Sequence, residues 1–545
     1  MIYPDTFEKK TGFDAVRSEV MRLCQSNGAR QTADEQLRFI TDYDVIIHRL
    51  RSVDEMVRIV SGDTAFPLGA TGDVESLLSK VRAEGTFLSA EELNIVNNAL
   101  LTSIAISDFF TAETEEGKTP YPTLTEIAAG IERFDRVSST ISRSIDRFGE
   151  IKDSASAELA QIRRQLQQTQ ASISSVMRRV ISRAIESGYL EADTSAVVRD
   201  GRLVLPVSPM HKRHINGIVH DESASGKTYF IEPAEMVEAN NRIRELQMEE
   251  RREMVRILKE ITASIRPDIE PMKETMHVVA EIDFIHAKAQ YALRVDAHMP
   301  HLNRDTELEW YHAVHPVLLL SLQSHGKTIV PLDITLSKKN RMLIISGPNA
   351  GGKSVCLKTV GIVQYMMQCG MLPTLYENSH MGIFESIFID IGDDQSIEDD
   401  LSTYSSHLRN MKYFLQHGNS ATLALIDEFG GGTEPTIGGA IAQAMLKNFN
   451  DKEMWGVITT HYQNLKNFAE DTPGLINGSM LYDRHLMQPL FKLHIGNPGS
   501  SFAIEIARKT GLPASIIADA EEIAGSDYVR LDRYLLDIAR DKRYW

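Results

Sequence analysis

The pattern of apolar and polar positions separates a helical first part of the chain from a second part in which strands and helices alternate. Residues 155–187 contain no proline or glycine. Residues that could face a partner helix recur there at spacings that alternate between three and four residues. These positions are Leu159, Ile162, Leu166, Thr169, Ile173, Val176 and Val180. Such heptad spacing predicts a long helix with a narrow apolar seam, typical of a coiled coil.

Residues 234–265 carry a second stripe of this kind and are the expected partner helix. The stripe is interrupted at Glu250 and consists of Ile243, Leu246, Met254, Ile257 and Ile261. We therefore expect an antiparallel stalk, roughly 50 Å long at 1.5 Å per helical residue. Two ordinary core helices are the alternative interpretation.

The segment between the two predicted helices, residues 189–233, has a different pattern. The stretch "AVVRDGRLVLPV" places two β-rich runs around Asp200-Gly201, which predicts a hairpin, and "HINGIVHDESASGKTYFIEP" suggests further strands. The densest basic spot of the chain, "HKRH" at 211–214, also lies here. It is either a solvated turn or a nucleic-acid contact, for which the candidates are Lys212, Arg213 and Lys227.

The rest of the first part, about residues 1–130 and 266–300, is predicted to be helical from stretches such as "LNIVNNALLTSIAI" and "VVAEIDFIHAKAQYALRV". Its sequence shows no acid–base pair and no metal-ligand cluster. It is expected to be a lever core that joins the stalk to the second part.

In the second part, the apolar run "MLIIS" leads directly into "GPNAGGKS", and a helical pattern follows. This arrangement fits a phosphate-binding loop. In such a loop backbone N–H groups face the phosphates, the lysine neutralises the β- and γ-oxygens, and the serine hydroxyl faces Mg²⁺. The candidate ATP-binding residues are Gly347, Pro348, Asn349, Ala350, Gly351, Gly352, Lys353 and Ser354.

A second Gly-Lys-Thr, residues 226–228, lacks that context. Position 221 is Asp221 where the loop needs its first glycine, and no helical pattern follows. We interpret it as a hairpin turn.

Two further apolar strands end in polar residues of the kind that an ATP-hydrolysing site needs. "TLALIDEFGGGTEP" ends its strand at Asp427, expected to hold Mg²⁺ through water, and Glu428, expected to activate the attacking water. "WGVITTHY" ends at His461, which would sense the γ-phosphate, although a histidine at a strand end is more often structural. The predicted catalytic residues are therefore Glu428, Lys353 and His461.

Length and composition limit the class of protein. A chain of 545 residues should form three or four domains, and 42% hydrophobic and 24% charged residues are typical of a soluble protein. No apolar run approaches the ~18–20 residues of a membrane span, and "MIYPDTFEKK" lacks the apolar core of a signal peptide. Three cysteines without a CxxC pair predict neither disulfides nor zinc. We expect a cytoplasmic protein without a membrane partner.

The net charge of −17 argues against general coating of nucleic acid. It leaves room for one local basic patch, because salt screens remote charge beyond about 10 Å.

Taken in order and spacing, "GPNAGGKS", "LSTYSSHLRNM" (401–411), "LIDEFGGGTEP" and "TTHY" resemble the MutS family of DNA-repair ATPases. The bacterial branch that lacks the mismatch-recognition domain fits best, since it starts directly with helices and has sequence similar to "GIVHDESASGKTYFIEP" and "IGDDQSIEDDLSTYSSH". The resemblance implies an ABC-like ATPase domain that uses ATP or ADP and Mg²⁺. It also implies a homodimer in which each protomer completes the site of the other.

By position, the resemblance implies that Ser402 and Thr403 reach the partner's γ-phosphate, that Asn349 lies beside the phosphates and that His461 is a switch histidine. Residues 497–523 look like the family's helix-turn-helix, which joins protomers, and residues 189–233 look like its clamp. The branch usually continues into a coiled coil and an Smr domain credited with nuclease activity. Since this chain ends at "LDIARDKRYW", no nuclease is assigned to it.

Four positions depart from the family pattern. Gly431, Glu434 and Ile437 stand where a hydroxyl residue, an aspartate and a glutamate are expected, and Val314 stands where a basic residue is usual. These departures put the geometry between the protomers in doubt, but not nucleotide binding.

The expected fold is mixed and multidomain: a helical lever core with an antiparallel coiled-coil stalk, a small β-rich clamp and an ABC-like α/β P-loop ATPase domain. The expected divisions are core 1–130, lever helix 131–188, clamp 189–233, returning helix and core 234–300, ATPase domain 301–523 and a further helix at 524–545. The expected function is an ATP-driven dimeric clamp on duplex or branched DNA that suppresses recombination. A ribosome-associated quality-control ATPase that binds rRNA, and an SMC-like structural ATPase, are the alternatives.

Overall fold

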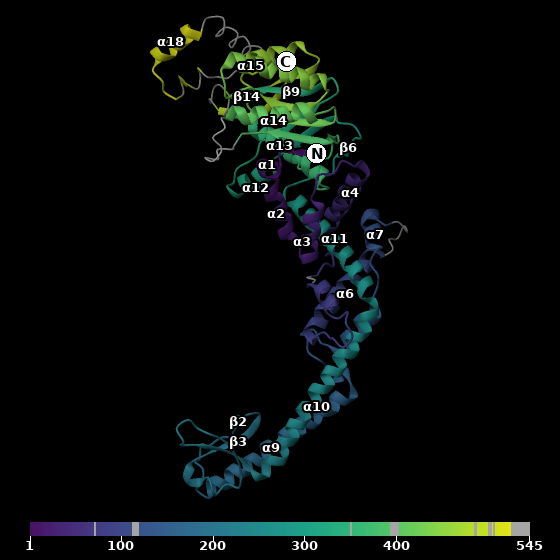
Figure 1. Cartoon of the computed structure of the whole chain (residues 1–545), viewed down its shortest axis with the longest axis vertical. Coiled ribbons are helices and arrows are strands. Elements are labelled where there is room, and N and C mark those ends of the chain that lie inside the picture. Colours follow the sequence, from purple (N-terminus) through teal and green to yellow (C-terminus); the bar gives the residue numbers. More distant parts are fainter. Residues whose placement is uncertain are drawn as a thin grey trace. The chain divides into compact units, whose positions relative to one another are not determined.

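The computed structural model describes residues 1–69, 72–111, 119–348, 351–392, 403–483, 488–499, 504, 507–508 and 510–524 (Figure 1). The chain separates into two compact units. Unit 1 combines Met1–Phe66 and Phe110–Ala128 with the chain from Ala280 onwards, and unit 2 combines Pro67–Phe109 with Ala129–Val279. The first 130 residues, expected to form one helical part, therefore contribute to both units.

Unit 1 is built around a seven-stranded sheet in the order β1-β11-β12-β13-β9-β14-β15. The strands are β1 (Ile2–Tyr3), β9 (Asn340–Ser346), β11 (Ser386–Asp390), β12 (Thr422–Ile426), β13 (Trp455–Thr459), β14 (Gly474–Asp483) and β15 (Gln488–Ile495). All pairings are parallel except that of β14 with β15. The inner strands are buried along their length, as expected for a parallel sheet covered on both faces.

One face of this sheet is covered by α14 (Thr403–His417), α15 (Pro435–Asp451) and α16 (Gln463–Asp471). Their buried residues, such as Phe414 and Leu446, pack with Ala424 and Ile426 of β12. The alternate residue Leu425 faces α13 (Lys353–Gln368) instead, where a Cβ on Gly361 would come within 3.1 Å of it. The sheet is thus sandwiched between helices, with α13 beside the N-terminal helices at the top of Figure 1.

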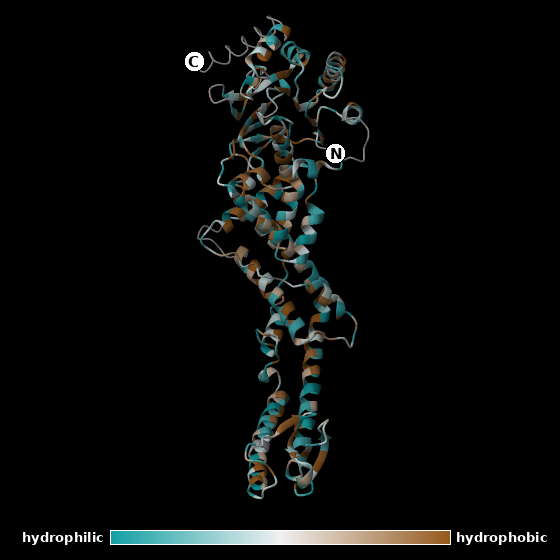
Figure 2. Ribbon diagram, turned by 90° about the vertical axis from the view of Figure 1, so that its left-hand side faces the viewer, coloured by the Kyte–Doolittle hydropathy of each residue, from teal (hydrophilic) through white to brown (hydrophobic). Residues whose placement is uncertain are grey.

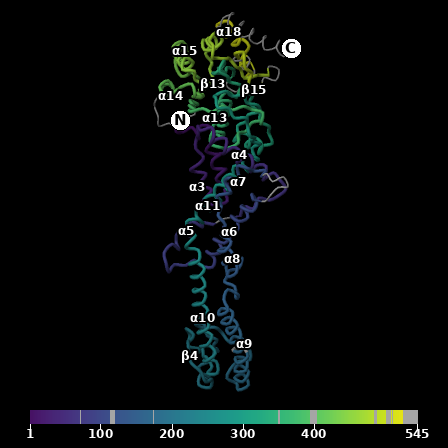
Figure 3. The backbone as a smooth tube through the Cα atoms, turned by 90° about the vertical axis from the view of Figure 1, so that its right-hand side faces the viewer, coloured from purple at the N-terminus to yellow at the C-terminus, as the bar shows by residue number. Residues whose placement is uncertain are grey.

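The remainder of unit 1 is a second sheet with surrounding helices. The sheet has the order β6-β10-β7-β8, with β6 (His301–Leu302), β7 (Leu308–Ala313), β8 (Leu332–Leu336) and β10 (His380–Met381). The helices are α1 (Phe7–Thr11), α2 (Phe13–Leu23), α3 (Asn27–Gln36), α4 (Tyr43–Val60), α7 (Pro122–Ala128) and α12 (Pro316–Ser324). The tube in Figure 3 shows these N-terminal helices, in purple, next to the green and teal part of the chain.

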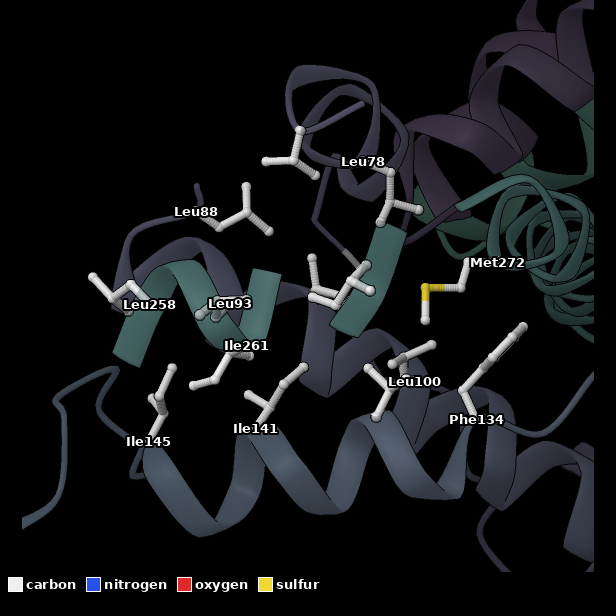
Figure 4. Packing of buried hydrophobic residues seen from close by; sticks show 14 of the residues in the cluster. Leu78, Leu88, Leu93, Leu100, Phe134, Ile141, Ile145, Leu258, Ile261 and Met272 are labelled. Atoms are coloured by element: carbon white, nitrogen blue, oxygen red, sulfur yellow. The ribbon is translucent and has the colours of Figure 1, made fainter. Parts of the chain in front are cut away.

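Unit 2 has an apolar core formed by its helices. These are α5 (Val74–Lys80), α6 (Ala90–Thr111), α8 (Asp135–Ser144), α9 (Ala157–Glu186), α10 (Ala234–Ile265) and the first part of α11 (Ile269–Arg294), which continues into unit 1. In Figure 4, Ile141 of α8 and Ile145, which follows the end of that helix, point towards Leu258 and Ile261 of α10.

Helix α6 corrects one expectation from the sequence. Among the described residues it is the one helix long and apolar enough to cross a membrane by length and composition, although half of that stretch is buried inside the protein. Leu93, Val96 and Leu100 of α6 belong to the core of unit 2. Packing within unit 2 therefore accounts for these residues of α6, whereas Ile95 and Leu101 of the same helix are exposed.

Helices α9 and α10 pack side by side in antiparallel directions. Near one end Ser156, which caps α9, donates to Glu253, and at the other end Arg183 pairs with Glu235. The predicted seam positions of α9 whose burial is described are buried or half-buried, and Figure 2 shows hydrophilic and hydrophobic residues interspersed along both helices. An antiparallel pair of this kind is what the two apolar stripes predict.

The chain between α9 and α10 forms a four-stranded sheet in the order β2-β3-β5-β4. Its strands are β2 (Val197–Arg199), β3 (Arg202–Val207), β4 (Gly217–Glu222) and β5 (Tyr229–Pro233). Asp200 and Gly201 both adopt positive φ angles, 46° and 71°, which match a type I′ hairpin turn between β2 and β3. Residues 223–228, with the second Gly-Lys-Thr, form the turn between β4 and β5, as the sequence predicts.

At the C-terminal end, α18 (Ala514–Ala524) supplies the second helix of the predicted helix-turn-helix. Most of the first helix and the predicted helix at 524–545 lie outside the described residues.

Candidate functional site

The strands that carry the predicted ATP-site residues are neighbours in the large sheet. The order β12-β13-β9 places the carboxyl ends of these parallel strands, Ile426, Thr459 and Ser346, along one edge. In open α/β sheets, this edge is where ligands bind. Topology alone therefore brings the loops that start at Gly347, Asp427 and Thr460 together.

Lys353 is the first residue of α13 and is 3% exposed. Its Nζ donates to the carbonyl of Gly347 at 2.6 Å and lies 3.2 Å from Nε2 of His461. Burial lowers the pKa of the Lys353 ammonium to about 8, although the nearby carboxylates of Asp427 and Glu428 act in the opposite direction. A buried cation with these neighbours is poised to receive negative charge.

The loop before Lys353 has the backbone that a phosphate site requires. Gly347 has φ 135° and Gly352 has φ 90°, both in the region that favours glycine. A Cβ on Gly352 would come within 3.0 Å of the Phe491 ring, so this position is also sterically restricted. Since Gly352 has no side chain to cap α13, the first N–H groups of the helix, together with Lys353, suit a phosphate group.

Asp427 and Glu428 occupy the end of β12. Asp427 is buried, and its Oδ1 accepts a hydrogen bond from the Thr459 hydroxyl. Glu428 is exposed, and its backbone N–H donates to Oγ1 of Thr459 at 2.8 Å. Its φ of 48° is uncommon for a residue other than glycine and is typical of functional sites. An exposed carboxylate thus lies next to a buried one, which suits a water-activating group beside a metal-binding group.

His461 follows β13 after Thr460 and completes the group. Burial lowers the pKa of His461, and the charges of Lys353 and Lys466 lower it further. A neutral imidazole can accept the hydrogen bond that Lys353 donates. The structure thus brings Lys353, Asp427, Glu428 and His461 together, with Ser354 in the first turn of α13.

Three of the predicted site residues, Asn349, Ala350 and Ser402, lie outside the described residues, and α14 begins at Thr403. The remaining loop residues Pro348 and Gly351 are buried, and the Gly351 N–H donates to the Pro348 carbonyl at 3.0 Å. The two described ends of the loop are therefore joined by a backbone hydrogen bond.

One departure from the family pattern has a structural role of its own. The Glu434 carboxylate caps α15 by accepting from the backbone N–H groups of Thr436 and Ile437, at 3.0 and 2.8 Å. These bonds lower the pKa of Glu434. Glutamate thus serves as the helix cap at a position where the family pattern has aspartate, while the Ile437 side chain is 62% exposed.

Asp390, His407 and Asn410 form a further polar group that was not among the predicted site residues. Asp390 is 4% exposed at the end of β11, and its carboxylate accepts from His407 at 2.7 Å and from Asn410 at 2.8 Å, both on α14. A strand ending in aspartate was a visible signal, since Asp427 was selected on that basis. The missing information was that β11 lies next to β12.

The predicted nucleic-acid contacts are found in the small sheet of unit 2, together with aromatic side chains. Lys212 Nζ lies 3.8 Å from the centre of the Tyr229 ring, and Lys227 is in the turn that precedes Tyr229. Arg213 and Lys227 are exposed, and His214 stacks on Tyr189 with ring centres 4.7 Å apart. The structure thus brings Lys212 and Lys227 to the same end of this sheet.

Comparisons with known proteins identify relatives of the whole chain and of its nucleotide-site region. Residues 343–526 match the model of MutS domain V. A protein named endonuclease MutS2 from Thermomicrobium roseum is 36% identical over 537 residues, which is 97% of this chain and 66% of the relative. A protein of the same name from Pelotomaculum thermopropionicum is 34% identical over 525 residues, which is 96% of this chain and 65% of the relative.

A third relative named endonuclease MutS2, from Carboxydothermus hydrogenoformans, is 33% identical over 535 residues, which is 98% of this chain and 67% of the relative. The chain spans about two-thirds of the length of these relatives. With similarity along nearly all of its own length and a domain match over its nucleotide-site residues, the chain belongs to the MutS family, in the branch named MutS2.

Proposed function

We propose that this protein is a cytoplasmic, Mg²⁺-dependent ATPase that acts as a homodimer on duplex or branched DNA and suppresses recombination. The observation that supports it most is the group formed by buried Lys353 and Asp427 with Glu428 and His461 at one edge of the sheet. This set combines a cation for phosphate oxygens with a buried and an exposed carboxylate.

Each residue of the site has a distinct proposed task. Lys353 and the N–H groups at the start of α13 bind the phosphates, while Ser354 and Asp427 would hold Mg²⁺, Asp427 through water. Bound Mg²⁺ would neutralise charge on the phosphate oxygens. Glu428 accepts a proton from the attacking water, and His461 senses the γ-phosphate from beside Lys353.

The DNA-holding part of the proposal concerns Lys212, Arg213 and Lys227. Side chains on turns and a short sheet suit contacts to phosphates rather than to base edges, because no helix presents them to a groove. rRNA has the same phosphate backbone, so a ribosome-associated ATPase is the competing function. Retention on a four-way DNA junction, compared with co-sedimentation with ribosomes, separates the two.

A composite ATP site can be tested by mixing protomers. In the proposed dimer, Ser402 acts on the partner's nucleotide and Lys353 on its own. A heterodimer of Ser402→Ala and Lys353→Ala protomers therefore has both defects in one site and an intact second site. When the two inactive proteins are mixed, we expect each mixed dimer to hydrolyse ATP at about half of the wild-type rate, which is about a quarter of the wild-type rate for a 1:1 mixture that reassorts at random.

Each variant mixed with itself is the control and should stay inactive. If mixing restores no hydrolysis, although the mixed dimer is shown to form, Ser402 acts within its own protomer and the proposed dimeric site is wrong.

A further inference from the structure

A polar cluster around Asp390 links the proposed ATP site to the start of α14. Its carboxylate is bound at both oxygens, since Oδ2 accepts from His407 Nδ1 at 2.7 Å and Oδ1 accepts from Asn410 Nδ2 at 2.8 Å. His407 and Asn410 are three residues apart on α14 and therefore share one face of the helix. Asp390 thus holds α14 to the end of β11 through two side chains.

The same residue also contacts the strand that carries the carboxylates of the site. The carbonyl of Asp390 accepts a hydrogen bond from the backbone N–H of Asp427 at 2.8 Å. One residue therefore connects His407 on α14 with the residue that precedes Glu428. The connection is short, because β11 and β12 are adjacent and in register, with Asp390 opposite Ile426.

Next to this link, α14 contacts the loop that follows Glu428 in one place, where a Cβ on Gly432 would come within 3.3 Å of Tyr404. Beside this contact lies a small pocket, whose lining includes Asp390, Tyr404 and His407 together with Phe429, Gly430 and Gly431. The first turns of α14 are therefore held by this contact at Tyr404 and by the polar bonds that His407 and Asn410 make to Asp390.

We propose that His407 is a positioning residue that, through Asp390, fixes the first turns of α14, the helix whose start is proposed to act on the partner's nucleotide. This inference rests on the proposed function. It adds that the position of the first turns of α14 is set by the end of β11, which is bonded to the start of the Asp427–Glu428 loop in the same protomer.

The charges around His407 support a strong bond. The hydrogen bond to Asp390 raises the pKa of His407 and outweighs burial, which lowers it. Glu428, from the loop after β12, also raises this pKa, and Lys10 of α1, which donates to the Ile391 carbonyl at 3.3 Å, lowers it. A hydrogen bond between a protonated imidazole and a carboxylate is about twice as strong as a neutral one.

The bond can be tested by changing the position of one nitrogen. In His407→Asn, the amide nitrogen takes about the place of Nδ1, whereas in His407→Gln it lies one bond further out. His407→Gln should lower kcat about tenfold, the equivalent of one lost charged hydrogen bond, with an unchanged Kd for ATP. His407→Asn should recover most of the loss.

His417→Asn is the matched control, since His417 lies on the same helix. Among the described residues, its Nδ1 lies within hydrogen-bond distance of the Tyr413 carbonyl and its ring stacks on the Tyr413 ring. It should leave kcat unchanged. Thermal melting of all three variants identifies a general loss of folding. If His407→Gln does not fold, Asp390→Asn tests the same link, because it removes the charge and keeps both side-chain positions.

Mixed dimers decide where His407 acts. His407→Gln protomers mixed with Lys353→Ala protomers should regain hydrolysis, as the Ser402→Ala mixture does. If the Ser402→Ala mixture recovers and the His407→Gln mixture does not, His407 serves its own site and this inference is overturned. If neither mixture recovers, the composite site itself is wrong and the inference falls with it. Equal losses in ATP affinity and kcat would also contradict a positioning role.

Discussion

At the scale of single residues, the site combines a buried cation, a buried carboxylate and a strained backbone. Lys353 gives up hydration and contacts the Gly347 carbonyl and His461. Glu428 has a left-handed backbone that the Thr459 hydroxyl stabilises. Such features cost free energy in the unbound protein, which is recovered when an anion enters.

The lowered pKa of Lys353 predicts how the affinity for ATP depends on pH. Phosphate binding favours the protonated ammonium, so affinity should be full below about pH 8 and should fall as the pH rises through that value. Between pH 7 and pH 9 we expect a loss of about tenfold, since each pH unit above the pKa removes about a factor of ten. Titration calorimetry with Mg·ATP gives the Kd at each pH.

Lys353→Arg is the control for this measurement, because guanidinium stays protonated over the whole range. Its affinity, whatever its absolute value, should be flat between pH 7 and pH 9. A flat wild-type curve would show that the ammonium is not neutralised in the unbound protein.

Glu428→Gln should separate binding from hydrolysis. The amide has nearly the same size but cannot accept the proton of the attacking water, so we expect unchanged ATP affinity and a kcat lowered by about 10²–10⁴-fold. ATP-trapped dimers should accumulate, which light scattering detects. Glu470→Gln, an exposed substitution on α16, is the control. Hydrolysis by Glu428→Gln at the wild-type rate would remove Glu428 from its assigned role.

At the scale of elements, a buried carboxylate joins the small sheet of unit 2 to α10. Glu232, at the end of β5, is fully buried and accepts from Arg202 of β3, His220 of β4 and Asn240 of α10. The pKa of Glu232 is lowered, because although burial raises it, these hydrogen bonds lower it by more. Three strands and a helix therefore share one charged group.

Glu232→Ala should loosen this sheet, because it leaves Arg202, largely buried, without its counter-charge. Removing one partner of a buried ion pair costs about 3–5 kcal/mol. Hydrogen exchange of residues 197–233 should accelerate accordingly. The exposed pair Arg183–Glu235 offers the control Glu235→Ala, which should cost at most about 1 kcal/mol.

The stabilisation by Glu232 also has a defined pH dependence. Because its folded pKa lies below the ordinary 4.5, the contribution is complete above that pH and is lost as the pH falls through the lowered value. If the hydrogen-exchange protection of residues 197–233 does not weaken on acidification, the negative charge of Glu232 does not have this role.

At the scale of the whole molecule, the proposed ATP chemistry and the proposed nucleic-acid contacts belong to different compact units. Lys353, Asp427 and Glu428 are in unit 1, and Lys212, Arg213 and Lys227 are in unit 2. Helix α11 is one covalent element shared by both. Substitutions in one unit are therefore expected to leave the proposed activity of the other unit, basal ATP hydrolysis or nucleic-acid binding, intact.

The triple variant Lys212→Ala, Arg213→Ala, Lys227→Ala should bind all DNA sequences more weakly. Each lost phosphate contact reduces the slope of log affinity against log salt by roughly 0.9, so the slope should become shallower by up to about 3. Basal ATP hydrolysis should persist, and its stimulation by nucleic acid should fall. Binding to homoduplex, mismatched and junction DNA over a salt series provides the measurement.

A triple alanine variant at the exposed Lys327, Lys338 and Lys339 of unit 1 removes the same charge and is the control. An unchanged slope in the first variant, or an equal change in the control, would place the contacts elsewhere. A strong preference of the wild-type protein for a mismatch over homoduplex would contradict the absence of mismatch recognition expected from the family branch.

The sequence by itself determined the elements and the local motifs, because these depend on neighbours in the chain. The period of apolar positions gave α9 and α10, Asp200-Gly201 gave the hairpin, and the strand–glycine–lysine order gave the loop at Gly347. A family resemblance was also visible at this level. Even α6 was predicted as a helix, although its apolar length was underestimated.

Only the tertiary structure decided which strand ends meet and which polar groups they share. Adjacency of β11 and β12 makes Asp390 a partner of both His407 and Asp427, and the pairing of β1 with β11 brings Tyr3 within 2.8 Å of Asn410. Likewise, Glu232 gains its role only when β3, β4 and α10 close around it. Such contacts join residues far apart in the chain, and sequence spacing carries no information about the order of strands in a sheet.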